Sequence, residues 1–303
     1  MFSRWRTAVA GAAAMATTVF PIGVGATAHA APPECPGLYV VAVPGTWETS
    51  KADPREGMLA AVTNNLPSNV RTDYVAYAAT AFPWEGNVYG RSEQEALNGA
   101  RGLVSAMARR CGETRFALLG YSQGANAAGD LAAEIGTGLG VVPANRVALV
   151  GLVADPRRSP SDQLIGRPVL GAGASGPRVG GFGWLSSRTY TFCAPGDLYC
   201  SMPNGDFAGR IAGLLTQLSN PDPAQFGNYQ QQVSTLINDA FLAGGLNLLD
   251  NQLTNSEYNQ RKKQIDDFLK SGIHQSYPRY VVDPSGDTAL TWLHQQLLNV
   301  AGS

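Results

Sequence analysis

The pentapeptide Gly120-Tyr121-Ser122-Gln123-Gly124 constrains the fold more than any other stretch of this chain. The apolar run from Arg115 to Leu119 predicts a buried strand before it, and the Ala-rich run from Ala125 to Ile135 predicts a helix after it. A strand, a sharp turn and a helix are the context that a G-x-S-x-G nucleophile elbow requires. A chain with 35 glycines can also contain this pattern by chance. We expect an elbow that holds the Ser122 hydroxyl exposed at the tip of a strained turn.

Apolar runs alternate with helical patterns along much of the remaining chain. A helix is predicted after Asp53 as N-cap, with Pro54 at its first position and a buried stripe of Leu59, Val62 and Leu66. A second helix is predicted from the capping box Ser92-Glu93-Gln94-Glu95 to Arg109. This alternation implies an α/β fold of three layers, in which helices cover both faces of a central parallel sheet. The further strands are predicted over Gly37–Val43, Thr72–Ala79, Val147–Ala154 and Arg188–Cys193.

The first thirty residues have the pattern of a signal peptide. Arg4 and Arg6 form a positive start, an apolar stretch runs from Ala8 to Val24, and Ala28-His29-Ala30 is a small-residue cleavage site. The rival interpretation is an N-terminal membrane anchor, which the prolines and glycines near the end of the apolar stretch disfavour. We therefore expect residues 1–30 to be removed and a single domain over 31–303 to be secreted or held in the cell envelope.

Composition excludes some classes of function. The chain has 303 residues, of which 44% are hydrophobic and 15% charged, and this suits a globular protein with a large core. Its formal net charge is −1, and nothing in the sequence suggests nucleic-acid binding, which would need a basic stripe. No stretch after the signal approaches the ~18 apolar residues that span a bilayer. We expect a monomer with no cofactor.

The four cysteines, Cys35, Cys111, Cys193 and Cys200, fit an exported protein. Four cysteines allow three pairings. We favour a short loop closed by Cys193–Cys200 and a long closure by Cys35–Cys111. No C-x-x-C pair is present, so no metal site is expected.

A serine nucleophile needs a base and a group that orients the base. Of the three histidines, His29 lies in the predicted signal peptide. His274 lies in a polar loop, whereas His294 lies in a predicted C-terminal helix where a packed or solvated histidine is the ordinary expectation. We choose His274 as the base.

Two carboxylates are candidates for the orienting acid. Asp197 lies between Cys193 and Cys200, where a disulfide would hold it on a stiff loop. Asp155 follows the fourth predicted strand, but Pro156 comes next and a turn residue is the simpler interpretation. We favour Asp197. The order Ser122, Asp197, His274 is then that of α/β-hydrolases.

The oxyanion of a tetrahedral intermediate needs hydrogen-bond donors. The elbow itself places the backbone N–H of Gln123 for that purpose. Thr46, in the loop Pro44-Gly45-Thr46-Trp47 after the first predicted strand, is the second candidate, through its N–H and its hydroxyl. The alternative is that Thr46 is an ordinary turn residue.

Residues from about 203 to 272 contain no convincing strand. Amphipathic segments over Phe207–Leu215 and Val233–Leu253 and a charged helix over Glu257–Leu269 indicate a helical insertion between acid and base. It is either a lid that shapes the pocket or a set of packing helices without a role.

These motifs together resemble the cutinase family of serine esterases. The resemblance rests on Gly-Tyr-Ser-Gln-Gly, on Asp197 between its two cysteines, on the spacing of the earlier pair, and on His274 with Tyr277 after it. It covers about 37–200 and 273–300 and implies an α/β-hydrolase fold with a triad of Ser122, Asp197 and His274.

Two departures from compact fungal cutinases refine this expectation. The connection between Asp197 and His274 is much longer, and the loop Val43 to Glu48 differs from the fungal oxyanion loop. Both features resemble cutinase-like esterases and lipases exported by mycolic-acid-containing actinobacteria, and the insertion also resembles that of phage lysin B enzymes, which cleave mycolyl esters.

The resemblance implies a secreted serine esterase or lipase that hydrolyses esters of long-chain lipids, with mycolyl esters such as trehalose dimycolate among them. Its partners would be a lipid or acylated-sugar ester and, by peripheral contact, envelope lipids. Acyl transfer to a sugar and deacetylation of carbohydrates are the alternatives within the same chemistry. A lipid-binding protein without catalysis is the alternative from another class.

Overall fold

One parallel sheet organises the part of the chain described by this computed structural model, which comprises residues 35–203, 206–217, 219–220, 230–231, 233–234, 236–237 and 255–302. Within these residues six strands occur in the order β2-β1-β3-β4-β6-β5, and every neighbouring pair is parallel. Parallel strands place all their carboxyl ends at one edge of the sheet, where ligands bind in such folds. The strands are β1 (Leu38–Val43), β2 (Val70–Tyr74), β3 (Arg115–Tyr121), β4 (Val147–Val153), β5 (Leu164–Ile165) and β6 (Thr189–Phe192).

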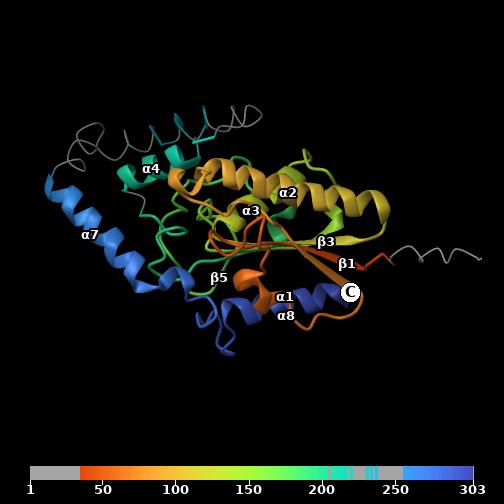
Figure 1. Cartoon of the computed structure of the whole chain (residues 1–303). Coiled ribbons are helices and arrows are strands. Elements are labelled where there is room, and N and C mark those ends of the chain that lie inside the picture. The colour runs from red at the N-terminus through yellow and green to blue at the C-terminus, as the bar shows by residue number, and fades with distance from the viewer. Residues whose placement is uncertain are drawn as a thin grey trace, which may run out of the picture. The chain divides into compact units, whose positions relative to one another are not determined.

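Helices cover both faces of the sheet, as Figure 1 shows. Alternate residues of β1 point to opposite sides, so Tyr39 and Val41 pack beneath α2 (Tyr89–Arg110) and α3 (Gln123–Gly136). Leu38 and Val40 belong to the opposite cluster, which includes residues of α8 (Ala289–Ala301) and lies on the side of α1 (Ala60–Thr63). Each fully buried side chain of this kind contributes roughly 1.5–3 kcal/mol. The predicted three-layer α/β fold is confirmed.

The predicted helix from Asp53 and Pro54 is wrong. Gly57 has a φ of 59°, a left-handed conformation that interrupts a helix, so the segment begins with a short 3-10 turn over Gly57–Leu59 and continues as the four-residue α1. Leu59 and Val62 are nevertheless fully buried, as the stripe predicted.

Two further boundaries differ from the predictions. β2 ends at Tyr74 instead of Ala79, and Ala79 has a φ of 53°, which a strand does not accommodate. α2 begins at Tyr89, before the predicted capping box, because the Ser92 hydroxyl accepts from the Thr80 N–H and donates to Gln123. Ser92 is therefore a connection to the elbow and not a helix cap.

The glycine-rich segment after β5 is only partly a surface loop. Glycine is frequent from Gly166 to Gly183, which is typical of a surface loop, and the two-residue β5 comes directly before it. Arg178 in the middle of the loop is buried, and it bonds the carbonyls of Ala125 and Asn126 in the first turn of α3. An ionic anchor thus holds this loop against the sheet.

Most of the described residues of the insertion are helical. α4 (Phe207–Gln217) and α7 (Asn255–Ser271) correspond to the first and last predicted helices. The predicted segment Val233–Leu253 lies outside the described residues except for Val233, Ser234, Leu236 and Ile237. The predicted signal peptide over 1–30 also lies outside them. Among the helices that are described, none is both long and apolar enough to cross a bilayer.

Candidate active site

The pentapeptide forms a tight turn at the carboxyl end of β3. Ser122 lies between β3 and α3 with φ 55° and ψ −120°, a strained conformation for a residue with a side chain. A Cβ on Gly120 would lie 2.4 Å from the Gly124 carbonyl oxygen, and one on Gly124 would lie 2.0 Å from the Val43 carbonyl oxygen. Only glycine fits at these two places, so the sequence pattern and the backbone geometry agree.

Three side chains far apart in the sequence form one hydrogen-bonded chain. The Oγ of Ser122 lies 2.8 Å from Nε2 of His274. The Nδ1 of the same imidazole lies 2.9 Å from Oδ2 of Asp197. The structure therefore brings together the nucleophile, base and acid that the sequence predicts. Nucleophilic catalysis by a serine requires contacts of this kind.

The loop that carries Asp197 is closed by the disulfide between Cys193 and Cys200. The Asp197 carboxylate is fully buried. Its Oδ1 accepts from the Tyr199 N–H at 3.0 Å, and its Oδ2 accepts from the Tyr277 hydroxyl at 2.6 Å. Burial, followed by the charge of Asp197, raises the pKa of Tyr277, so this phenol stays protonated and remains a donor. The carboxylate is thus held from three directions.

Aromatic rings enclose the imidazole of His274. Tyr121 stacks on it with ring centroids 5.2 Å apart, and Tyr199 lies 4.4 Å away. The Tyr121 hydroxyl also donates to the His274 carbonyl at 2.7 Å. Phe268 of α7 meets the ring edge-on at 6.5 Å, so the inserted region touches the base. These contacts restrict the orientation of the imidazole.

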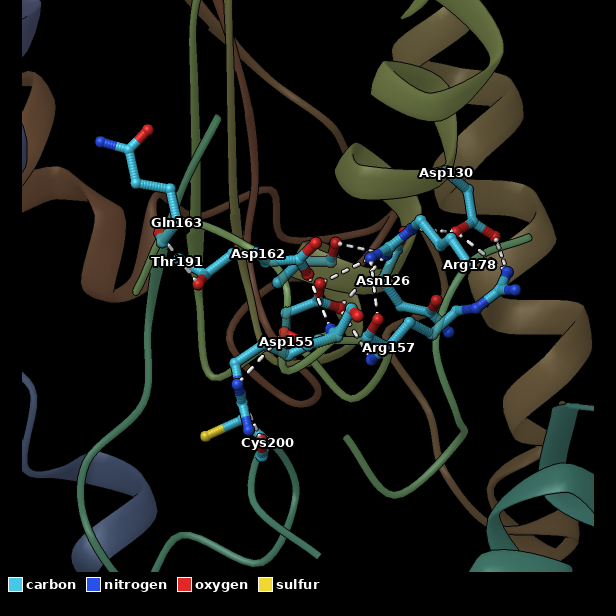
Figure 2. Close-up of polar contacts among 12 residues, drawn as sticks. Asn126, Asp130, Asp155, Arg157, Asp162, Gln163, Arg178, Thr191 and Cys200 are labelled. Atoms are coloured by element: carbon cyan, nitrogen blue, oxygen red, sulfur yellow. Dashed lines mark hydrogen bonds and ion pairs between the residues drawn. The ribbon is translucent and has the colours of Figure 1, made fainter. Parts of the chain in front are cut away.

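The alternative acid has a different partner, as Figure 2 shows. Asp155 is fully buried, and its Oδ2 lies 2.6 Å from Nη1 of Arg178. Its Oδ1 accepts from the Arg157 N–H at 2.9 Å. Arg178 and Arg157 both pair with Asp130 of α3 as well. The carboxylate of Asp155 therefore anchors the loop, whereas Asp197 contacts the base.

The alternative base also has a structural partner. Nδ1 of His294, on α8, donates to the carbonyl of Val62 at 2.8 Å and joins α8 to the end of α1. This is the packed histidine that the predicted C-terminal helix led us to expect.

Two backbone N–H groups are free for an oxyanion. The first N–H groups of a helix have no partner within it, and Gln123 is the first residue of α3. Within the described residues, neither the N–H nor the hydroxyl of Thr46 has a hydrogen-bond partner. Both predicted donors thus lie next to the elbow with an unused hydrogen.

One short segment connects the two donors. The Ala79 carbonyl accepts from the Trp47 N–H at 2.8 Å, next to Thr46. The Thr80 carbonyl accepts from Nε2 of Gln123 at 3.1 Å. Residues 79–80 therefore bond both the neighbour of Thr46 and the side chain of Gln123.

A half-buried glutamate holds the Thr46 loop from the other side. Oε2 of Glu48 accepts from the Gly45 N–H at 2.8 Å, and Oε1 accepts from the Met58 N–H at 2.9 Å. Burial raises the pKa of the Glu48 carboxyl, and these two N–H donors act against the rise. This role of Glu48 is not predictable from the sequence, because nothing in the loop marks Glu48 as a bridge to the segment after Gly57.

Both cysteine pairs form the favoured disulfides. Cys35 is bonded to Cys111 and Cys193 to Cys200. The first pair ties the start of β1 to the end of α2, and the second closes the acid loop. Among the residues that the structure describes, no group of three or more His, Cys, Asp or Glu is placed to hold a metal ion.

Comparison with known sequences gives a family match. Residues 34–210 match the family model described as Cutinase. Carboxylesterase Culp6 homolog of Corynebacterium glutamicum is 31% identical over 221 residues, which cover 60% of this chain and 71% of that protein. Carboxylesterase Culp1 of Mycobacterium tuberculosis is 31% identical over 191 residues, which cover 63% of this chain and 79% of that protein.

Comparison with solved structures gives weaker likenesses. The catalytic core domain of acetyl xylan esterase from Trichoderma reesei matches with a TM-score of 0.47 and 19% identity, over 66% of this chain and 99% of that one. Lysin B from Mycobacteriophage D29 matches with a TM-score of 0.41 and 16% identity, over 70% and 92%. The sequence match alone carries the family assignment.

Proposed function

Because this chain belongs to the cutinase family and is a carboxylic ester hydrolase, we propose that it hydrolyses esters of long-chain lipids through a triad of Ser122, His274 and Asp197. Mycolyl esters of the cell envelope, such as trehalose dimycolate, are the substrates that we put first. The observation that carries the proposal is the continuous hydrogen-bonded chain from Ser122 to Asp197.

The mechanism follows from that chain. Ser122 Oγ attacks the ester carbonyl while Nε2 of His274 takes its proton, and Asp197 stabilises the imidazolium that results. The proton then passes to the departing alcohol, which leaves an acyl-enzyme on Ser122. Water, deprotonated by the same imidazole, attacks the acyl-enzyme and releases the acid.

The negative charge of the tetrahedral intermediate falls on the former carbonyl oxygen. The N–H of Gln123 and the N–H or hydroxyl of Thr46 are the donors for it. Removal of one such donor costs about 10²–10³ in kcat in a serine hydrolase. Residues 79–80 link the two segments that carry these donors, which supports their pairing.

Exposed apolar side chains on the insertion support a lipid substrate. Leu215 on α4 and Ile265 and Leu269 on α7 are exposed, and α7 also supplies Phe268 beside His274. Such side chains suit contact with acyl chains or, peripherally, with envelope lipids. The Corynebacterium and Mycobacterium relatives agree with the resemblance to esterases of mycolic-acid-containing actinobacteria.

We also propose that the protein is exported. Its disulfides form and persist in oxidising compartments. The signal pattern over residues 1–30 provides the route.

The test compares wild type with Ser122→Ala on two panels. The first consists of p-nitrophenyl esters of increasing chain length, and the second of trehalose dimycolate, triacylglycerol and phospholipid. We expect Ser122-dependent turnover that rises with chain length and includes trehalose dimycolate. Equal rates for the two proteins would contradict the role of Ser122 as the nucleophile. A preference for acetyl over octanoyl esters would overturn the lipid substrate in favour of carbohydrate deacetylation.

A further inference from the structure

Three exposed aromatic rings lie in a row beside the candidate oxyanion loop. Phe82 and Trp84 stack with centroids 4.5 Å apart and planes 6° from parallel. Trp47 continues the row at 6.2 Å from Phe82, with an angle of 30° between the planes. Their exposed fractions are 60% for Trp47, 41% for Phe82 and 79% for Trp84. Exposure of this much aromatic surface indicates that a ligand covers it.

Two of the three rings belong to segments that lie close in sequence to the candidate oxyanion contacts. Trp47 directly follows Thr46, the candidate oxyanion donor. Phe82 comes two residues after Thr80, whose carbonyl accepts from the Gln123 side chain. A ligand on the rings is therefore a part of the substrate close to the ester, either its acyl chain or its alcohol.

The rings are fixed before any ligand binds. Oε1 of Glu85 accepts from Trp47 Nε1 at 2.6 Å, and its Oε2 accepts from the N–H groups of Ala81 and Phe82, both at 2.8 Å. These N–H donors lower the pKa of Glu85, so the carboxylate is ionised at neutral pH. A preformed surface gains affinity because little side-chain freedom is lost on binding.

The geometry distinguishes between the possible occupants. An alkyl chain is buried by a groove that closes around it, whereas Trp84 projects outward with most of its ring exposed. A sugar ring needs only one flat surface, because its C–H groups pack against the electron-rich face of an aromatic ring. Since Phe82 covers one face of Trp84, the outer face of Trp84 is the surface open to a sugar. Insertion of the row into a lipid surface would carry the ionised Glu85 with it, at a high desolvation cost.

We propose that Trp47, Phe82 and Trp84 form a subsite for a sugar ring in the alcohol part of the substrate ester. The inference rests on the esterase function proposed above and specifies its substrate as an acylated sugar. Phe82 and Trp47 then connect the stacked sugar to the loop that carries Thr46.

The experiment compares three esters of one acid: trehalose mono-octanoate, p-nitrophenyl octanoate and an emulsion of trioctanoylglycerol. We expect Trp84→Ala and Phe82→Ala to lower kcat/KM for the trehalose ester relative to the p-nitrophenyl ester by about three- to tenfold, through KM. Trp184→Ala is the matched control, because Trp184 is 83% exposed but stacks on no ring among the residues that the structure describes. We expect it to leave that ratio unchanged.

Other outcomes overturn the proposal. An equal loss on the trehalose and p-nitrophenyl esters would show a general effect on the oxyanion loop. A loss confined to the emulsion would show that the rings bind a lipid surface, and no loss at all would leave the rings without a role in binding.

A binding measurement separates this proposal from the esterase function. Trehalose is titrated into Ser122→Ala and into Ser122→Ala with Trp84→Ala, with tryptophan fluorescence as the readout. We expect saturable binding that the second change weakens. Binding without turnover of any ester would contradict the proposed hydrolysis and leave the subsite standing, whereas turnover without binding would contradict the subsite.

Discussion

Tyr277 donates a 2.6 Å hydrogen bond to Oδ2 of Asp197, the same oxygen that lies 2.9 Å from Nδ1 of His274. The phenol and the imidazole therefore share one acceptor atom. A short bond to a buried carboxylate holds that oxygen in place whether or not the imidazole carries a second proton. The acid of the candidate triad is thus oriented by a residue outside the triad.

Tyr277→Phe is expected to lower kcat about five- to twentyfold with little change in KM, because it removes one charge-assisted donor and keeps the ring. Steady-state kinetics on a p-nitrophenyl ester measure the effect. Tyr280→Phe is the control, since Tyr280 packs against Tyr277 but its hydroxyl accepts from the Arg167 N–H instead. Equal effects of the two substitutions would contradict a specific role for Tyr277.

Asp155→Asn is expected to lower stability, whereas Asp197→Asn is expected to lower kcat. Loss of the Asp155 charge leaves the buried Arg178 with one carboxylate fewer, and breaking such a pair costs about 3–5 kcal/mol of stability. Loss of the Asp197 charge lowers kcat by about 10³–10⁴ and leaves the fold intact. Urea unfolding and kinetics on the same samples separate the two. A greater loss of kcat from Asp155→Asn would restore Asp155 as the acid.

Glu93 gives the protein a pH-dependent stability. Burial, with the nearby charge of Asp130, raises its pKa from 4.5 to about 8. Between these two pH values the unfolded chain ionises Glu93 while the folded chain keeps it protonated, so this group lowers stability as pH rises. Glu93→Gln removes the effect. The stability of the variant relative to wild type is expected to improve by about 1.4 kcal/mol for each pH unit across that window, measured by urea unfolding. A difference that is constant with pH would contradict the raised pKa.

The two disulfides are expected to contribute differently. Replacement of Cys193 and Cys200 by serine frees the acid loop, so kcat falls while the sheet remains folded. Replacement of Cys35 and Cys111 opens a closure with a sequence separation of 76, so stability falls by roughly 2–5 kcal/mol while kcat is kept. Thermal unfolding and kinetics on both double variants test this. A Cys193/Cys200 variant that stays fully active until it unfolds would contradict the positioning role.

Much of the fold could be predicted because its signals are local. The short apolar runs that form β1, β3 and β4 must be buried from water, and this pattern predicts the central strands of a sheet. Gly120 and Gly124 mark a turn in which a Cβ would collide with backbone. The histidines could be assigned by elimination, and the cysteines on either side of Asp197 marked its loop. Each of these predictions needed only neighbouring residues.

The remaining features depend on contacts between distant segments. Nothing near Glu48 in the sequence indicates that its carboxylate accepts a hydrogen bond from the Met58 N–H. Nothing near Ser92 indicates that its hydroxyl donates to the Gln123 side chain instead of capping a helix. The same applies to Arg178, which the glycine-rich sequence around it placed on the surface. Hydrogen bonds across the sheet edge decided these three cases, and one segment alone does not encode them.

The positions of the triad along the chain also determine when activity can begin. Ser122 precedes His274 by 152 positions, and Asp197 precedes it by 77. During synthesis the chain carries all six strands and a finished elbow long before its base exists. A growing or truncated chain that ends within the insertion has a serine that nothing activates. The proposed hydrolysis therefore cannot begin until synthesis of the chain has passed His274.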